Sequence, residues 1–165
     1  MIVVGDSSPF VVLIKIGHIG VLPLLFNEIL IPPQVALELG SLRRPDEVRA
    51  FMASEPSWLR IVAPTSIELI PGLHPGETAA ITLAKETYAD RLIMDEYSGR
   101  KAAVERGLRV VGTVGLLELA AERGLLELKD AFERVKQTDF WVSHSLLDQR
   151  LALFHQRRQN FKPAD

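Results

Sequence analysis

The sequence predicts an α/β protein in which helices cover both faces of a central parallel sheet. Two observations predict this fold class. Short β-rich apolar runs alternate with helical stretches along the chain, and prolines and glycines mark where the helices start and stop. Strands that are separated by helices pair in parallel, and their crossover helices then cover the sheet on both faces.

The N-terminal segment supplies the first strand and two helices. Residues 2–5 (IVVG) form a short β-branched run that ends at glycine, which is typical of a buried strand. Residues 9–19 suit a helix with a proline in its first turn and Ser7 or Ser8 as its cap. A second short helix is expected at 21–26 (VLPLLF).

The middle of the chain continues the alternation. Residues 28–32 (EILIP) form a second apolar run, and 32–40 open with prolines and close with glycine, as helices do. Another helix is expected at 45–54, while 58–63 (WLRIVA) alternate like a strand. The helix expected at 74–89 carries an acid in its first turn, where the helix dipole favours negative charge.

The last part of the pattern supplies two more strands. Residues 91–96 (RLIMDE) read as a strand that ends in acid, and 98–107 as a helix that stops at glycine. Residues 108–112 (LRVVG) form a strand, followed by a helix that Thr113 caps. Two helices are expected within 127–160. No internal repeat or linker interrupts the chain, so a single domain is expected.

Composition narrows the classes of protein. A chain of 165 residues that is 47% hydrophobic and 24% charged is long and apolar enough to bury roughly 70% of its unfolded surface. The absence of cysteine excludes disulfides and thiolate metal sites. No signal peptide and no membrane-length apolar run are present, so a cytoplasmic protein without a membrane association is expected. A net charge of −2 gives no overall electrostatic attraction for nucleic acid, so binding to nucleic acid would depend on a local basic patch.

Acidic residues gather where chemistry is expected in such a sheet. Asp6 and Asp95 both stand at the carboxyl end of a predicted strand, the edge at which doubly wound sheets place their sites. Further acids lie on the helices that follow (Glu38 and Glu77), and Glu96 comes directly after Asp95. Hard cations such as Mg²⁺ and Mn²⁺ prefer carboxylate oxygens, and acids that converge without a cation would repel one another. A bound metal ion would polarise a phosphate and activate water, which predicts metal-assisted phosphodiester hydrolysis.

The order of short blocks resembles one known family. In sequence order the blocks are VVGDSSPF, IPPQVALEL, PGETAAITLA, LIMDEYSGRKAA and VVGTVGLLELAAERGL. They resemble the PIN-domain family of metal-dependent nucleases, and within it a prokaryotic, toxin-like subgroup. The resemblance covers residues 1–126 as the domain core. Residues 127–165 fall outside it and are expected to form a helical extension packed on the same domain.

The resemblance implies a three-layer α/β/α sandwich with strand order 3-2-1-4-5 and additional C-terminal helices. In that order the strands ending at Asp6 and Asp95 are neighbours. The implied catalytic and metal-binding acids are Asp6, Glu77 and Asp95, with Glu38 and Glu96 as further metal ligands. The implied substrate-binding residues are Ser8 and Thr113, and the implied cofactor is Mg²⁺ or Mn²⁺. Arg100 opens the helix after Asp95, from where it could also contact a phosphate of the substrate.

The implied function is a divalent-metal-dependent endoribonuclease that acts as the toxin of a type II toxin–antitoxin pair. RNA, a small antitoxin protein and a second copy in a homodimer are the implied partners. The alternative is a non-catalytic PIN-like protein whose metal site is degenerate and which acts as a nucleic-acid-binding or regulatory protein. The alternative depends on Glu77, because the family usually has Asp at this position.

Structural roles also compete for several candidate residues. Asp6 could serve as a turn or cap residue, and Glu77 could be placed by the helix dipole alone. Glu38 and Glu96 could be solvated surface acids. Basic pairs such as Arg43-Arg44, and the tail at 157–162, could contact RNA or be solvated.

Overall fold

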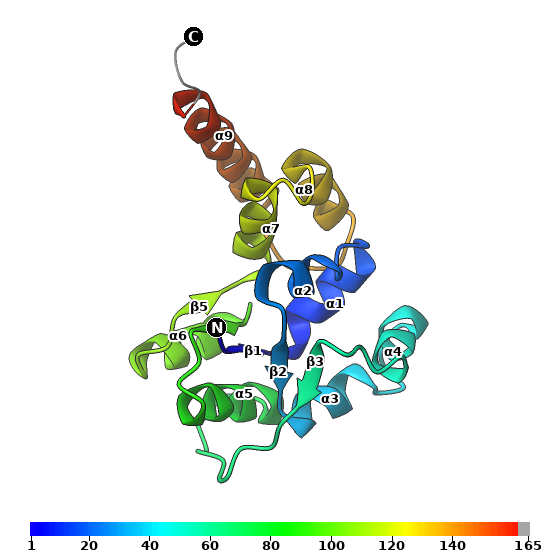
Figure 1. The fold of residues 1–165 in the computed structure, drawn as a ribbon, viewed down its shortest axis with the longest axis vertical. Coiled ribbons are helices and arrows are strands. Elements are labelled where there is room, and N and C mark those ends of the chain that lie inside the picture. Colours follow the sequence, from blue (N-terminus) through cyan, green and yellow to red (C-terminus); the bar gives the residue numbers. More distant parts are fainter. Residues whose placement is uncertain (162–165) are drawn as a thin grey trace. The chain divides into compact units, whose positions relative to one another are not determined.

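The computed structural model describes residues 1–161, and within them five short strands form one parallel sheet (Figure 1). The order β3-β2-β1-β4-β5 confirms the order 3-2-1-4-5 that the resemblance implied. The strands lie within the five segments expected from the sequence. They are β1 (Val3–Gly5), β2 (Ile29–Ile31), β3 (Leu59–Ile61), β4 (Arg91–Ile93) and β5 (Val110–Val111).

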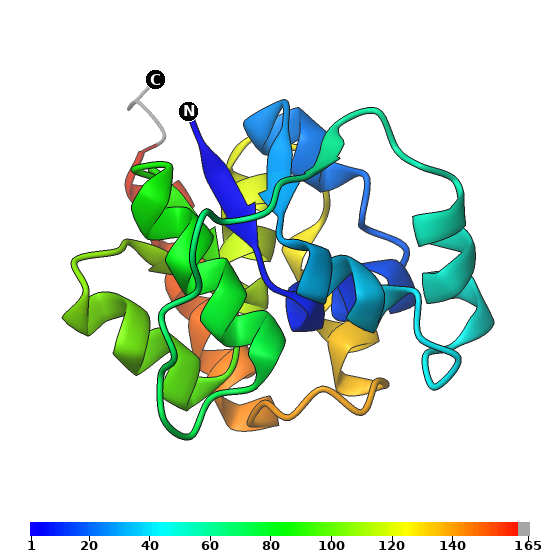
Figure 2. The ribbon, with the colours of Figure 1, turned by 90° about the horizontal axis from the view of Figure 1, so that it is seen from below.

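Helices fill the segments between the strands, as the alternating pattern predicted. Before β5 these are α1 (Ser7–Lys15), α2 (Val21–Phe26), α3 (Pro33–Leu39), α4 (Asp46–Ala53), α5 (Pro75–Glu86) and α6 (Tyr97–Glu105). Figure 2 shows α5 and α6 on one side of β1, and α1, α3 and α4 on the other. The α/β/α fold class is therefore confirmed. None of the helices within residues 1–161 combines the length and apolar character needed to cross a bilayer.

The register of β1 and β4 sets the geometry of the site. Gly5 pairs with Ile93, and the N–H of Asp6 donates to the carbonyl of Ile93 at 2.9 Å, which extends the pairing by one residue. The chain then turns into α1 after Asp6, while the segment after β4 runs on through Met94, whose N–H donates to the Val111 carbonyl at 3.0 Å, to Asp95. Because both strands run in parallel, the two acids emerge at the same edge of the sheet.

Gly5 and an aromatic cluster hold α1 against the sheet. A side chain at Gly5 would collide with the ring of Phe10, so glycine allows the helix to approach the strand closely. Phe10 stacks on Trp58 with ring centroids 6.5 Å apart, and Phe51 lies against both rings. This packing fixes the start of α1, where Asp6 and the two serines lie.

Two expected helix caps are corrected by the structure. Helix α1 begins at Ser7, so Asp6 occupies the N-cap position, and neither Ser7 nor Ser8 caps the helix. The Asp6 side chain makes no capping hydrogen bond either. Helix α7 (Thr113–Glu122) begins at Thr113, whose hydroxyl is directed to Asp95 at 2.6 Å and not to the helix.

The chain divides into two compact units, residues 1–113 and 114–165. The second unit contains the remainder of α7 together with α8 (Leu128–Lys136) and α9 (His144–Asn160), which confirms the two helices expected within 127–160. Within this unit, the buried carboxylate of Glu118 pairs with Arg150, and Lys136 bridges Glu133 and Asp148. Of the basic tail at 157–162, Lys162 lies outside the described residues, as do the last three positions of the expected extension.

Candidate functional site

An acidic cavity opens at the carboxyl end of β1. Its volume is about 290 Å³. Three parts of the chain form its wall: the start of α1, the end of α3 with the loop after it, and the first turn of α5. Its lining residues are Asp6, Ser7, Ser8, Glu38, Arg44, His74, Pro75 and Glu77.

Asp6 is the most buried acid of this cavity, with 2% of its surface exposed. Its Oδ1 is buried and accepts no hydrogen bond within the described part of the chain. The pKa of Asp6 is raised to about 7, first of all by burial. A hydrogen bond from the Ser7 backbone lowers it, and the negative charges of Glu38, Glu77 and Asp95 add to the rise. A cation would stabilise this site, because it would supply a partner for the buried carboxyl oxygen and offset the repulsion among the neighbouring acids.

Glu38 reaches the cavity from α3 and is held by Ser7. The Ser7 hydroxyl donates to Glu38 Oε2 at 2.6 Å. On its other side, Glu38 lies so close to Gly76 of α5 that any side chain at Gly76 would overlap its carboxylate. Glycine at this position therefore makes room for the acid.

Glu77 has two roles. It is the third residue of α5, and its Oε2 accepts the backbone N–H of His74 at 3.0 Å, which caps the helix. The same carboxylate lines the acidic cavity. The structural role anticipated for Glu77 and its place at the candidate site are thus both present.

Asp95 lies beside the acidic cavity and does not line it. Both of its oxygens are bound by Thr113: Oδ1 accepts the backbone N–H at 2.7 Å, and Oδ2 accepts the hydroxyl at 2.6 Å. The pKa of Asp95 is raised overall. Burial is the largest cause, and the two hydrogen bonds from Thr113 and the charge of Arg100 act in the opposite direction. A side chain at Gly112 would collide with Arg100 and lie 2.8 Å from Asp95 Oδ1, so Gly112 keeps this arrangement open.

Glu96 is exposed and serves as the N-cap of α6. Its Oε2 accepts the N–H of Gly99 at 2.8 Å. Its suggested role as a metal ligand stays a prediction, because the contact that the structure shows is a capping bond.

The structure therefore brings Asp6, Ser8, Glu38 and Glu77 to one cavity. Beside it, Thr113 is hydrogen-bonded to Asp95, and Arg100 donates to the carbonyl of Met94 and acts on Asp95 through its charge. Sequence reasoning did not assign four lining residues to this site: Ser7, Arg44, His74 and Pro75. Only His74 carries a local signal, because it precedes a proline and lies three residues before a glutamate, the pattern of a helix start. Arg44 reaches the site through the loop after α3, where its Nε donates to the carbonyl of Glu38 at 3.4 Å.

A divalent ion needs several ligand atoms that converge on one point. Within residues 1–161, no group of three or more Asp, Glu, His or Cys side chains is arranged to hold a metal ion. Three of the acids instead bind protein donors, namely Ser7, His74 and Thr113. The chemistry of the set still fits a hard cation, since it consists of carboxylates and includes a buried oxygen that has no donor.

Comparison with known proteins identifies the family. A family model described as a PIN domain matches residues 2–156, which is most of the chain. The match extends into α9, beyond the blocks quoted above, which end at residue 126. No curated protein matches the chain. The chain therefore belongs to the PIN-domain family, whose members are generally nucleases and hence hydrolases.

Proposed function

We propose that the protein is a divalent-metal-dependent endoribonuclease that hydrolyses RNA phosphodiester bonds. One observation carries the proposal: the buried Oδ1 of Asp6, which has no hydrogen-bond partner among residues 1–161, in a cavity shared with Glu38 and Glu77 at the edge of the sheet. Membership of a nuclease-type family adds support.

In this proposal Asp6, Glu38, Glu77 and Asp95 hold Mg²⁺ or Mn²⁺. When bound, the ion would supply Lewis-acid chemistry, stabilising the developing charge on the phosphate and lowering the pKa of water. Ser7 orients Glu38 through its 2.6 Å hydrogen bond, and Thr113 orients Asp95 through two. Ser8 and Arg44 line the cavity where the substrate would lie, and the Arg44 guanidinium can bind a phosphate oxygen.

Cleavage assays test the proposal. Structured and unstructured RNAs are incubated with Mn²⁺ and with wild type, Asp6→Asn or Glu47→Gln, the last changing an exposed acid of α4. We expect wild type and Glu47→Gln to cleave equally, and Asp6→Asn to lose about 100-fold or more of the rate, as electrostatic active-site groups do. Equal activity of wild type and Asp6→Asn, or no cleavage by any of the three proteins, would contradict it.

The alternative function is a non-catalytic protein that binds nucleic acid through the same fold. The observation in its favour is that the acids engage protein donors and form no ready-made metal cluster within residues 1–161. It predicts RNA binding by wild type that neither requires Mn²⁺ nor leads to cleavage.

The biological setting that we propose is a type II toxin–antitoxin pair. Its support is the resemblance of the sequence blocks to the toxin-like subgroup, and the proposal includes a small antitoxin and a homodimer. Expression of the chain with and without the product of an adjacent short reading frame tests it. Growth arrest that this product relieves is expected, and growth unaffected by the chain alone would contradict it.

A further inference from the structure

A second, apolar cavity adjoins the acidic one. Its volume is about 330 Å³, which lies at the lower end of the range for small-molecule sites. Apolar side chains within residues 67–73, in the loop between β3 and α5, form most of its wall. Pro75 and Thr78 of α5 and Gln34 of α3 complete it.

The two cavities share part of their walls. Pro75 lines both of them. On α3, Gln34 lines the apolar cavity and Glu38 the acidic one, and residues four apart lie on the same helix face. A ligand whose phosphate reaches the acidic cavity through a bound cation, with a flat, largely apolar group in the next cavity, would match this arrangement.

Gln34 supplies the polar recognition that an apolar pocket otherwise lacks. Its Oε1 is buried and has no donor within the described residues. The last torsion of a glutamine side chain is broad, so the amide can turn towards a donor in the cavity. An amino group is the partner that this oxygen lacks.

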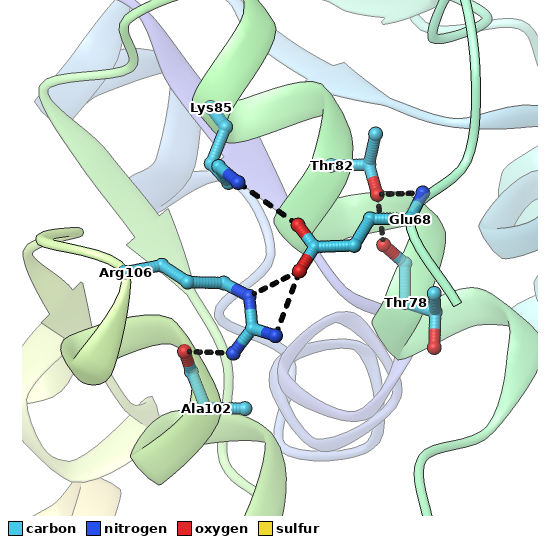
Figure 3. Close-up of polar contacts among 6 residues, drawn as sticks. All are labelled: Glu68, Thr78, Thr82, Lys85, Ala102 and Arg106. Carbon is cyan, nitrogen blue, oxygen red and sulfur yellow. Dashed lines mark hydrogen bonds and ion pairs between the residues drawn. The ribbon is translucent and has the colours of Figure 1, made fainter. Parts of the chain in front are cut away.

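The loop that forms the wall is fixed in place by polar contacts (Figure 3). Glu68 accepts from Arg106 at 2.8 and 3.0 Å and from Lys85 at 2.9 Å. These contacts, Arg106 first, lower the pKa of Glu68 to about 2, so the carboxylate is charged at neutral pH. The N–H of Glu68 donates to Thr82 Oγ1 at 3.2 Å, which ties the loop to α5. These contacts hold the loop at Glu68, between two residues that line the cavity, which lowers the cost of ordering this part of the loop around a ligand.

We propose that the apolar cavity is a nucleobase subsite for the RNA strand whose phosphate lies at the acidic cavity. This inference rests on the proposed function and specifies its substrate. The aliphatic wall covers the faces of the base, and Gln34 Oε1 accepts from its exocyclic amino group. Adenine, cytosine and guanine carry an exocyclic amino group and uracil carries none, so uracil is the disfavoured base.

Binding of mononucleotides tests the subsite without any cleavage. The full-length protein with Mg²⁺ and labelled Ile and Leu methyl groups is titrated with AMP, CMP, UMP and ribose 5-phosphate and followed by NMR. We expect AMP and CMP to shift the methyls of Ile67, Ile70 and Leu73, and to bind roughly fivefold more tightly than UMP, the worth of one hydrogen bond. Equal shifts from ribose 5-phosphate, or no shifts from AMP and CMP, would overturn the proposal.

Four variants sharpen the test. Gln34→Leu should abolish the preference over UMP, while Gln34→Glu, which keeps an acceptor, should retain it. Leu69→Ala should weaken the binding of AMP and CMP, and Leu42→Ala should not, although both leucines are 88% exposed. Amide spectra confirm that each variant is folded. A preference for AMP that survives Gln34→Leu would contradict the assigned role of the amide.

The outcome separates this inference from the proposed function. Nucleotide binding without Mn²⁺-dependent RNA cleavage would support the nucleobase subsite and contradict the proposed nuclease activity. RNA cleavage without nucleotide binding would contradict the nucleobase subsite and support the nuclease activity. Shifts of the same methyls by an apolar peptide and not by nucleotides would assign the cavity to a protein partner and overturn the proposal.

Discussion

Among single residues, Asp6 has the largest conflict between its charge and its surroundings. Its pKa is raised from 3.8 to about 7, first by burial and then by the charges of Glu38, Glu77 and Asp95. Between these two pH values the unfolded chain loses the proton that the folded protein keeps. The free energy of unfolding therefore falls as pH rises through this window, and the contribution of Asp6 is lost above pH 7.

Asp6→Asn should remove this dependence. We expect wild type in EDTA to lose on the order of a few kcal/mol more stability between pH 5 and pH 8 than the variant does. Urea unfolding of both proteins at the two pH values measures the difference. Because all other titrating groups are common to both, an identical pH dependence would show that Asp6 ionises normally in the folded protein.

Glu77 allows its two roles to be separated by substitution. Glu77→Gln keeps an oxygen for the His74 N–H but removes the charge, so stability should change little while Mn²⁺-dependent cleavage falls sharply. Glu77→Ala removes both, and should also cost about 0.5–2 kcal/mol of stability. Cleavage rates and urea midpoints of the two variants provide the comparison. Full activity of Glu77→Gln would limit this residue to helix capping.

At the scale of secondary-structure elements, the close approach of α3 and α5 determines where Glu38 lies. The approach depends on Gly76, because any side chain there would overlap the Glu38 carboxylate. Gly76 has no positive φ, so its role is spatial and not conformational.

Gly76→Ala should therefore displace Glu38 without damaging α5. Alanine is a better helix former than glycine by about 1 kcal/mol. This gain should offset part of the cost of moving Glu38, so the free energy of unfolding should change little. Mn²⁺ affinity and cleavage should both decrease. Gly20→Ala is the matched control, because a side chain there meets no atom within 4 Å. Equal loss of Mn²⁺ affinity in both variants would contradict the role of Gly76.

At the scale of the whole molecule, the sequence predicted the sheet and its acids better than the contacts among them. Alternating elements and strand-end acids sufficed to place Asp6 and Asp95 at one edge of the sheet, and the family blocks gave the strand order. The partner of Glu38 was not predictable, because Ser7 and Ser8 are equivalent in the sequence and only the turn at Asp6 decides which one faces α3. Arg44 was predicted only as a possible RNA contact, and its place at the cavity was not predictable because a loop with no periodicity carries it there.

Metal binding should be coupled to the proton on Asp6. A cation at the acidic cavity would favour the carboxylate, so Mn²⁺ must displace a proton wherever Asp6 is still protonated. With a pKa of about 7 in the ion-free protein, binding at pH 6 should release close to one proton more than binding at pH 8, and the affinity should be higher at pH 8. Calorimetric titration of the full-length protein with Mn²⁺, in buffers of different ionisation enthalpy, counts these protons. Asp6→Asn should bind more weakly and lose the pH-dependent difference, whereas tight binding of Mn²⁺ with no proton release at pH 6 would place the ion away from Asp6.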